Sequence, residues 1–189
     1  LDWTLTWSDN LLAERIARLA SAAAGNTLDD KGVALTFATM LTEMGISTSN
    51  LVVKDASGLS KENRVTARQI SQLLMVIYHD PKFIPLIKGL PVGGVSGTLQ
   101  HRFIETAPTA VGLVRAKTGT LNGTTNLAGY VESGEHQYIF VIIADRHSKS
   151  YSVTKKVRAT VDRILGKIAV PLLPVLPNAP SSESVTATN

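Results

Sequence analysis

The spacing of hydrophobic residues changes twice along the chain. Over roughly the first hundred residues, apolar side chains recur every three or four positions, the period of an amphipathic helix. They then gather in short β-branched runs typical of strands, before helical spacing returns. The pattern predicts helices over residues 11–24, 29–43, 66–78, 81–87 and 152–168, and strands over residues 51–53, 111–116, 127–131 and 138–144.

The last three predicted strands follow one another with short connections. Gly123 and Gly134 lie in these connections, which favours an antiparallel meander. Helices, then strands, then a final helix indicate an α+β fold, an antiparallel sheet flanked by helices. We expect one domain over residues 1–169. Residues 170–189 hold several prolines followed by Ser, Thr and Asn without periodicity, so we expect a disordered or linker tail there.

Composition excludes several kinds of function. With 189 residues, 44% of them apolar, the chain is long enough for one sizeable core. The net charge is +4, but the basic residues are scattered, which argues against nucleic-acid binding. The absence of cysteine rules out disulfides, thiolate metal sites and cysteine nucleophiles. No initiator methionine or signal peptide is visible, and we expect that an N-terminal portion of the protein is missing.

Two short motifs carry the candidate chemistry. Lys117-Thr118-Gly119-Thr120 lies at the end of the first predicted meander strand, and Ser8-Asp9-Asn10 lies at the start of the first predicted helix. Lys-Thr-Gly is expected by chance only about 0.07 times in this composition, and Ser-x-Asn about 0.6 times. Taken separately, the first motif is also compatible with a strand end and the second with a helix cap. Together and in this order they match the third and second motifs of active-site serine penicillin-binding proteins and class A β-lactamases.

The residues around both motifs extend this match over most of the chain. From residue 7 to the last helix the sequence resembles the D-alanyl-D-alanine carboxypeptidases/endopeptidases, the low-molecular-mass class C penicillin-binding proteins. The resemblance implies the C-terminal part of a serine β-lactamase/transpeptidase-like domain, in a bacterial protein that works outside the cytoplasm, in the periplasm, in the cell wall or as a secreted enzyme. The flanking segments that carry it are residues 8–14, 55–60, 63–66, 94–99, 116–121 and 127–131.

The resemblance also implies catalytic roles for Ser8, Asn10 and Lys117. Ser8 would pass a proton toward the leaving group, and Asn10 would hydrogen-bond the substrate amide and steady a catalytic lysine. Lys117 would place a positive charge beside the substrate carboxylate and the anionic transition state.

The same resemblance implies that Thr118, Gly119 and Thr120 bind the substrate. The two hydroxyls would hold a terminal carboxylate, the Thr120 N–H would donate to the oxyanion, and Gly119 would let the ligand approach closely. The implied partners are a peptidoglycan stem peptide ending in D-Ala-D-Ala and β-lactam antibiotics. No metal or organic cofactor is implied.

One motif of the family is absent from its expected place. The nucleophile motif Ser-x-x-Lys should precede Ser8, but the chain matches it only at residues 152–155, after the Lys-Thr-Gly motif, where we expect a chance match. The chain alone is therefore expected to be inactive, to require the missing N-terminal part as a partner, and to expose apolar surface. Two alternatives stay open: a non-catalytic module that binds peptidoglycan or assembles with a partner, and a fragment of a serine β-lactamase.

Overall fold

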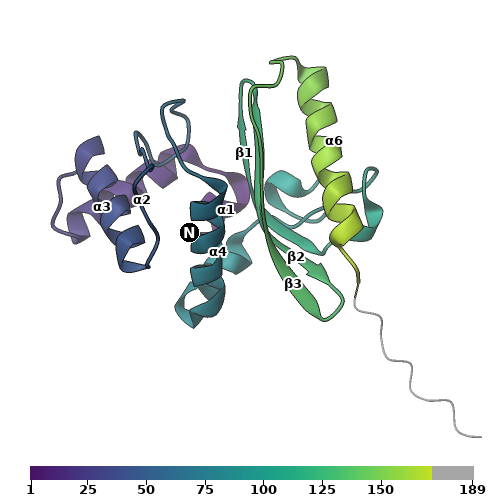
Figure 1. Ribbon diagram of the computed structural model, residues 1–189, viewed down its shortest axis with the longest axis horizontal. Coiled ribbons are helices and arrows are strands. Elements are labelled where there is room, and N and C mark those ends of the chain that lie inside the picture. The colour runs from purple at the N-terminus through teal and green to yellow at the C-terminus, as the bar shows by residue number, and fades with distance from the viewer. Residues whose placement is uncertain (172–189) are drawn as a thin grey trace, which may run out of the picture.

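The computed structural model describes residues 1–171 (Figure 1). Within these residues, no helix is long and apolar enough to cross a lipid bilayer. The chain forms helices before the sheet and one long helix after it, with short 3-10 turns between them (Figure 1). The α-helices are α1 (Asp2–Trp7), α2 (Asn10–Ala23), α3 (Asp30–Glu43), α4 (Ala67–His79), α5 (Ile84–Gly89) and α6 (Tyr151–Ile168); the 3-10 helices are η1 (Pro81–Phe83), η2 (Gly97–Leu99) and η3 (Pro108–Ala110).

The sheet is the antiparallel meander that the sequence predicts. Strands β1 (Val114–Leu121), β2 (Thr124–Ser133) and β3 (His136–Ala144) lie in the order β1-β2-β3, so β1 is an edge strand. The Lys-Thr-Gly motif lies in the last half of its strand, as predicted, but the strand itself is displaced from the predicted residues 111–116. Thr118 pairs with Leu127 and Thr120 with Thr125, and this pairing extends β1 through the motif to Leu121.

Helices cover both faces of the sheet (Figure 1). Helix α6 packs on β2 on one face, and α4 packs on β3 on the other. The main apolar core lies between α6 and the sheet, where Val114, Leu127 and Leu165 are at most 1% exposed. Burying such side chains contributes about 1.5 to 3 kcal/mol each. This core fixes β1, which carries the Lys-Thr-Gly motif.

Helices α2 and α3 form a separate pair at the end of the molecule away from α6 (Figure 1). Both helices begin at an aspartate whose carboxylate accepts a backbone hydrogen bond: Asp9 from the N–H of Leu12, and Asp29 from the N–H of Gly32, each at 2.9 Å. The helices begin at Asn10 and Asp30, each within one residue of the starts predicted at residues 11 and 29.

Two further expectations and one helix that was not predicted can be compared with the structure. The predicted strand over residues 51–53 is wrong, because Val52 makes only an isolated bridge with Arg64 and has no neighbouring strand to extend it. Helix α1 was not predicted. Val170, at the start of the predicted tail, still pairs with Ser133, and residues 172–189 lie outside the described part of the chain.

Candidate active site

Ser8 lies at the junction of two helices. It ends α1 in the left-handed conformation, with φ 59° and ψ 49°, and its backbone N–H donates to the carbonyl of Thr4. The next residue, Asp9, already caps α2. A left-handed backbone costs a residue other than glycine about 1 kcal/mol or more. The two helix ends hold Ser8 in this conformation and so fix its side chain.

Helix α1 in turn rests on the segment that precedes the sheet. The hydroxyl of Thr6 donates to the carbonyl oxygen of Gly89 at 2.9 Å. The Cα of Gly97 approaches α1 so closely that a Cβ there would lie 2.3 Å from the carbonyl oxygen of Thr6. Gly97 also has a φ of +56°, which favours glycine. The position of Ser8 therefore depends on a contact made by the backbone of Gly97.

The outer edge of β1 is covered along only part of its length. The segment 91–93 pairs with its first residues: the N–H of Gly93 donates to the carbonyl of Val114, and the N–H of Ala116 donates to the carbonyl of Pro91. Backbone groups alternate in direction along a strand, so the N–H and C=O groups of Thr118 and Thr120 also face this edge. Within residues 1–171, no backbone segment pairs with the edge beyond Ala116.

Lys117 meets Ser8 where this open edge begins. Its Nζ donates to the Oγ of Ser8 at 2.6 Å and to the carbonyl oxygen of Thr118 at 3.2 Å. Lys117 is half-buried and, within the described residues, forms no ion pair. Burial lowers the pKa of Lys117 below its ordinary value of 10.5, because desolvation disfavours the charged amine. The two motifs, 109 residues apart, thus form one polar site.

The two threonines of the motif contact residues that sequence reasoning did not identify. The hydroxyl of Thr118 lies 2.9 Å from that of Thr98 in η2. The hydroxyl of Thr120 accepts a hydrogen bond at 3.3 Å from the Nη2 of Arg158 in α6. Thr98 lies in the segment 94–99 that carries part of the family resemblance, but no role in the site was assigned to it; Arg158 lies in no motif, and no sequence signal links it to Thr120, 38 positions away.

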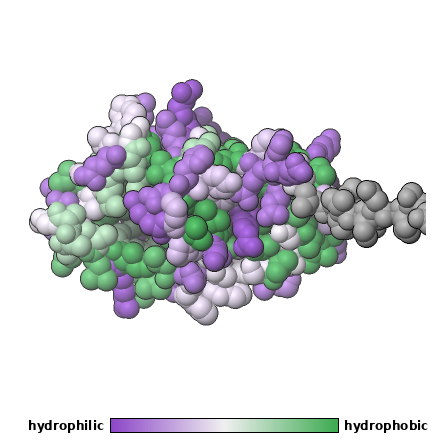
Figure 2. All heavy atoms as spheres, turned by 90° about the horizontal axis from the view of Figure 1, so that it is seen from below, coloured by the Kyte–Doolittle hydropathy of each residue, from purple (hydrophilic) through white to green (hydrophobic). Residues whose placement is uncertain are grey.

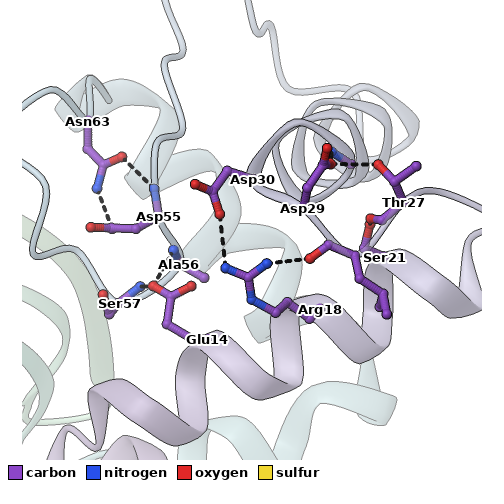
Figure 3. A network of polar contacts seen from close by, with 12 residues as sticks. Glu14, Arg18, Ser21, Thr27, Asp29, Asp30, Asp55, Ala56, Ser57 and Asn63 are labelled. Atoms are coloured by element: carbon purple, nitrogen blue, oxygen red, sulfur yellow. Dashed lines mark hydrogen bonds and ion pairs between the residues drawn. The ribbon is translucent and has the colours of Figure 1, made fainter.

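A polar network holds α2, and with it Asn10, against the loop that follows residue 53 (Figure 3). The carboxylate of Glu14 accepts hydrogen bonds from the N–H groups of Ala56 and Ser57 at 2.9 and 2.8 Å. The carboxylate of Asp55 accepts from the N–H of Gly58 at 2.8 Å and closes the turn. These bonds fix α2 and this loop relative to each other, although Asn10 itself is exposed.

A cleft of about 1880 Å³ surrounds the site. Ser8, Asn10 and residues 117–120 line it, so the structure places all six predicted site residues around one space. Much of its remaining wall is apolar and exposed to solvent: Phe37, Val52 and Ile143 are 38, 39 and 43% exposed. Figure 2 shows apolar side chains on the molecular surface, with large patches at the end that α2 and α3 occupy. Apolar patches of this kind mark surfaces that bind a partner or another part of the protein.

The Ser-x-x-Lys match at residues 152–155 lies in the first turns of α6. The hydroxyl of Ser152 pairs with that of Ser150 at 2.8 Å, and Ser152 does not line the cleft. Lys155 does line it. Across residues 1–171, no group of three or more acidic or histidine side chains is placed to hold a metal ion.

Comparison with known proteins relates this geometry to a peptidase family. The sequence profile of the D-Ala-D-Ala carboxypeptidase 3 (S13) family matches residues 2–168. Carboxypeptidase DacB of Mycolicibacterium smegmatis is 41% identical over 128 residues, which are 66% of this chain and 28% of that protein. A D-alanyl-D-alanine carboxypeptidase of Actinomadura sp. is 41% identical over 113 residues, 57% of this chain and 21% of that protein. The chain thus spans less than a third of these relatives.

Solved structures agree on the fold. Penicillin binding protein 4 (dacB) of Haemophilus influenzae, in complex with a β-lactam, matches with a TM-score of 0.78 and 26% identity over 88% of this chain and 40% of that chain. A predatory peptidoglycan endopeptidase of Bdellovibrio bacteriovorus matches with a TM-score of 0.62 at 16% identity, which bears on the fold alone. The predicted fold class, a helix-flanked antiparallel sheet of the penicillin-binding protein type, is confirmed. The chain belongs to the D-Ala-D-Ala carboxypeptidase 3 (S13) family.

Proposed function

We propose that this chain supplies one wall of the active site of a serine-type D-Ala-D-Ala carboxypeptidase or endopeptidase. The enzyme acts on peptidoglycan stem peptides outside the bacterial cytoplasm and is acylated by β-lactams. The observation that carries the proposal is the hydrogen bond of 2.6 Å between Lys117 Nζ and Ser8 Oγ beside an unpaired strand edge. It joins a cation, a hydroxyl and free backbone donors in one cleft, as peptide cleavage through an acyl-enzyme requires.

Substrate binding begins at the open part of β1. An extended peptide pairs with the outward backbone groups of Thr118 and Thr120, a form of β-augmentation. The terminal carboxylate is held by the hydroxyls of these two threonines and by the charge of Lys117. A charged hydrogen bond of this kind is worth about 1.5 to 3 kcal/mol.

The nucleophilic serine lies outside this chain, and the chain supplies the groups that stabilise the oxyanion and protonate the leaving amine. The oxygen of that serine forms a bond to the carbonyl carbon of the penultimate D-alanine while its proton passes to the lysine of the same Ser-x-x-Lys motif, and the oxyanion receives a hydrogen bond from the N–H of Thr120. When the C–N bond breaks, Ser8 gives its proton to the leaving amine. The lysine of the Ser-x-x-Lys motif, which took the proton of the attacking serine, returns it to the Ser8 oxygen, while Lys117 keeps its charge and its hydrogen bond to that oxygen. Water then hydrolyses the ester, while Asn10 orients the peptide.

Gly119 supports this substrate-binding interpretation. A Cβ at this position would have its nearest neighbour, the Cβ of Asn126, at 3.4 Å, which is ordinary contact. The φ of Gly119 does not lie in the left-handed region either. Because neither internal packing nor backbone conformation requires glycine, close approach of a ligand is the remaining physical reason for it. A Gly119→Ala variant is therefore expected to keep the fold and to lose acylation.

The missing wall of the cleft is proposed to come from the N-terminal part of the same protein. It carries the Ser-x-x-Lys motif on a helix that covers the exposed apolar residues Phe37, Val52 and Ile143. The chain produced alone is expected to bind a hydrophobic dye and to self-associate. Dye binding should fall when the N-terminal part is present.

Fluorescent penicillin tests the proposal directly. The protein with its N-terminal part should be labelled covalently, and the chain of 189 residues alone should not be. Lys117→Ala should reduce the labelling rate about 100- to 1000-fold, the effect of losing an oxyanion-stabilising group. Lys155→Ala removes another lysine of the same cleft and is the matched control, with a rate near that of the wild type.

The alternatives make different predictions in the same experiment. Labelling of the chain alone, lost in Ser152→Ala, would show that the motif in α6 is the nucleophile. If the longer protein is never labelled but still binds peptidoglycan peptides, it is a non-catalytic module. Rapid release of the label with hydrolysis of the penicillin would identify a β-lactamase.

A further inference from the structure

Helix α6 places a second cation at the site, at the end of the motif away from Lys117. Arg158 is half-buried, lines the cleft, and donates from Nη2 to the hydroxyl of Thr120 at 3.3 Å. Side chains alternate between the two faces of a strand, so Lys117 extends from the face opposite Thr120, where it contacts Ser8. The segment from Lys117 to Thr120 is therefore flanked by two positive charges.

The turn of α6 that carries Arg158 is anchored by a buried ion pair. Asp162, 3% exposed and one turn after Arg158, pairs with the guanidinium of Arg102. The same guanidinium donates to the carbonyl oxygen of Arg158 at 3.2 Å, and the hydroxyl of Thr106 donates to the Asp162 carboxylate at 3.1 Å. Asp162 is thus already neutralised by Arg102, and these bonds fix the backbone from which the Arg158 side chain extends.

The charge of Arg158 itself has no partner of opposite sign among residues 1–171. A guanidinium has five N–H donors and matches the two oxygens of a carboxylate. A hydroxyl oxygen that accepts a hydrogen bond from a cation directs its own hydrogen elsewhere. Arg158 thus both prepares Thr120 as a donor toward the cleft and supplies a charge beside it.

We propose that Arg158 is a specificity-determining residue that selects ligands with a free carboxylate, acting through Thr120 and by its charge. The inference rests on the function proposed above and adds a residue from α6 to the two motifs. It predicts that the discrimination between a carboxylate and its uncharged counterpart depends on Arg158. Lys117 acts on the same anion from the opposite side, so the two cations contribute separately.

The test compares charged and neutral forms of one ligand on the longer protein. The second-order rate of acylation is measured with a penicillin and its methyl ester, and peptide cleavage with a stem peptide ending in D-alanine or D-alaninamide. Arg158→Gln is expected to lower the rate for the charged form about 10- to 100-fold, as for the loss of one hydrogen bond to a charged group. The neutral form should change little, so the ratio of the two rates falls.

Two further variants separate specificity from structure. Arg158→Lys keeps the charge without the fork of donors and should restore part of the ratio. Lys155 lies one turn before Arg158 in α6 and also lines the cleft. Lys155→Gln removes its positive charge and should leave the ratio of the rates for the charged and neutral ligands unchanged.

The failure modes are distinct. A wild-type protein that reacts with neither form overturns the proposed function and this inference together. A wild-type protein that is acylated, with a ratio that Arg158→Gln leaves unchanged, overturns this inference alone. Equal losses for the charged and neutral ligands would overturn it as well, because they would show a structural role.

Discussion

Replacing Gly97 with alanine should disturb the site without touching any residue that contacts substrate. The new Cβ would lie 2.3 Å from the carbonyl oxygen of Thr6, whereas ordinary contact begins at 3.4 Å. Helix α1 and η2 must therefore move apart by about 1 Å. Because Ser8 ends α1, the displacement reaches the hydroxyl that Lys117 contacts. The φ of +56° adds a backbone cost of about 1 to 2 kcal/mol.

The effect on rate should be large compared with the effect on stability. A displacement of about 1 Å at a reacting group can lower a rate about 100-fold. The assay is the initial rate of labelling by fluorescent penicillin, with the thermal unfolding midpoint measured by circular dichroism. Gly112→Ala is the matched control, because Gly112 has a φ of +81° and a Cβ there would meet no atom of residues 1–171 within 4 Å. It imposes the backbone cost without the clash.

Labelling of the Gly97→Ala and Gly112→Ala proteins at the same rate would contradict this prediction. Equal rates would mean that the contact between α1 and η2 does not position Ser8. A much slower Gly97→Ala protein with an unfolding midpoint close to that of Gly112→Ala would support it.

Three other variants test the chemistry of buried groups. The folded pKa of Lys117 is lowered, so its proton is bound more tightly in the unfolded chain. The free energy of unfolding should therefore rise as the pH increases toward 10.5. In denaturant titrations at several pH values, Lys117→Met should lack this rise. If the free energy of unfolding of the variant and of the wild type changed equally with pH, Lys117 would not be its source. Asp162→Ala leaves the guanidinium of Arg102 buried and unpaired, and should cost about 3 to 5 kcal/mol in urea unfolding. Replacing both partners with apolar residues should recover most of that loss; no recovery would argue against the charge as its cause. Leu165→Ala, at a fully buried position, should cost about 2 to 5 kcal/mol by the same measurement, and a loss below about 1 kcal/mol would place this residue outside the core.

Long periodic segments were predictable from the sequence, whereas short and context-dependent ones were not. Helix α6 and the meander carry patterns that extend over many residues. Helix α1 has six residues, too few for a helical period to be visible, and its stability comes from packing on α5 and η2. The segment at residues 51–53 has strand-like composition but no strand beside it to pair with.

The site residues also divide into those that the sequence could predict and those that it could not. Ser8 and Lys117 could be placed together because two motifs of one family imply a shared cleft, and the hydrogen bond between them confirms that proximity. Their catalytic roles stay proposals. Thr98 lies in a segment of the family match, but the sequence did not show that it contacts Thr118. Arg158 could not be predicted, because it reaches Thr120 through the packing of α6 on the sheet, and the hydrophobic pattern of a helix indicates only which face is buried.

The open stretch of β1 also bears on how the protein behaves in solution. An unpaired strand edge attracts any extended chain, including the same edge of a second molecule. Here the unpaired stretch is short, because the segment 91–93 pairs with the edge of β1 as far as Ala116. The positively charged Lys117 lies directly after the paired part of the edge. Two copies pairing through this edge would bring like charges together and meet the walls of the cleft. The geometry that leaves room for one peptide thus also limits the growth of intermolecular sheets.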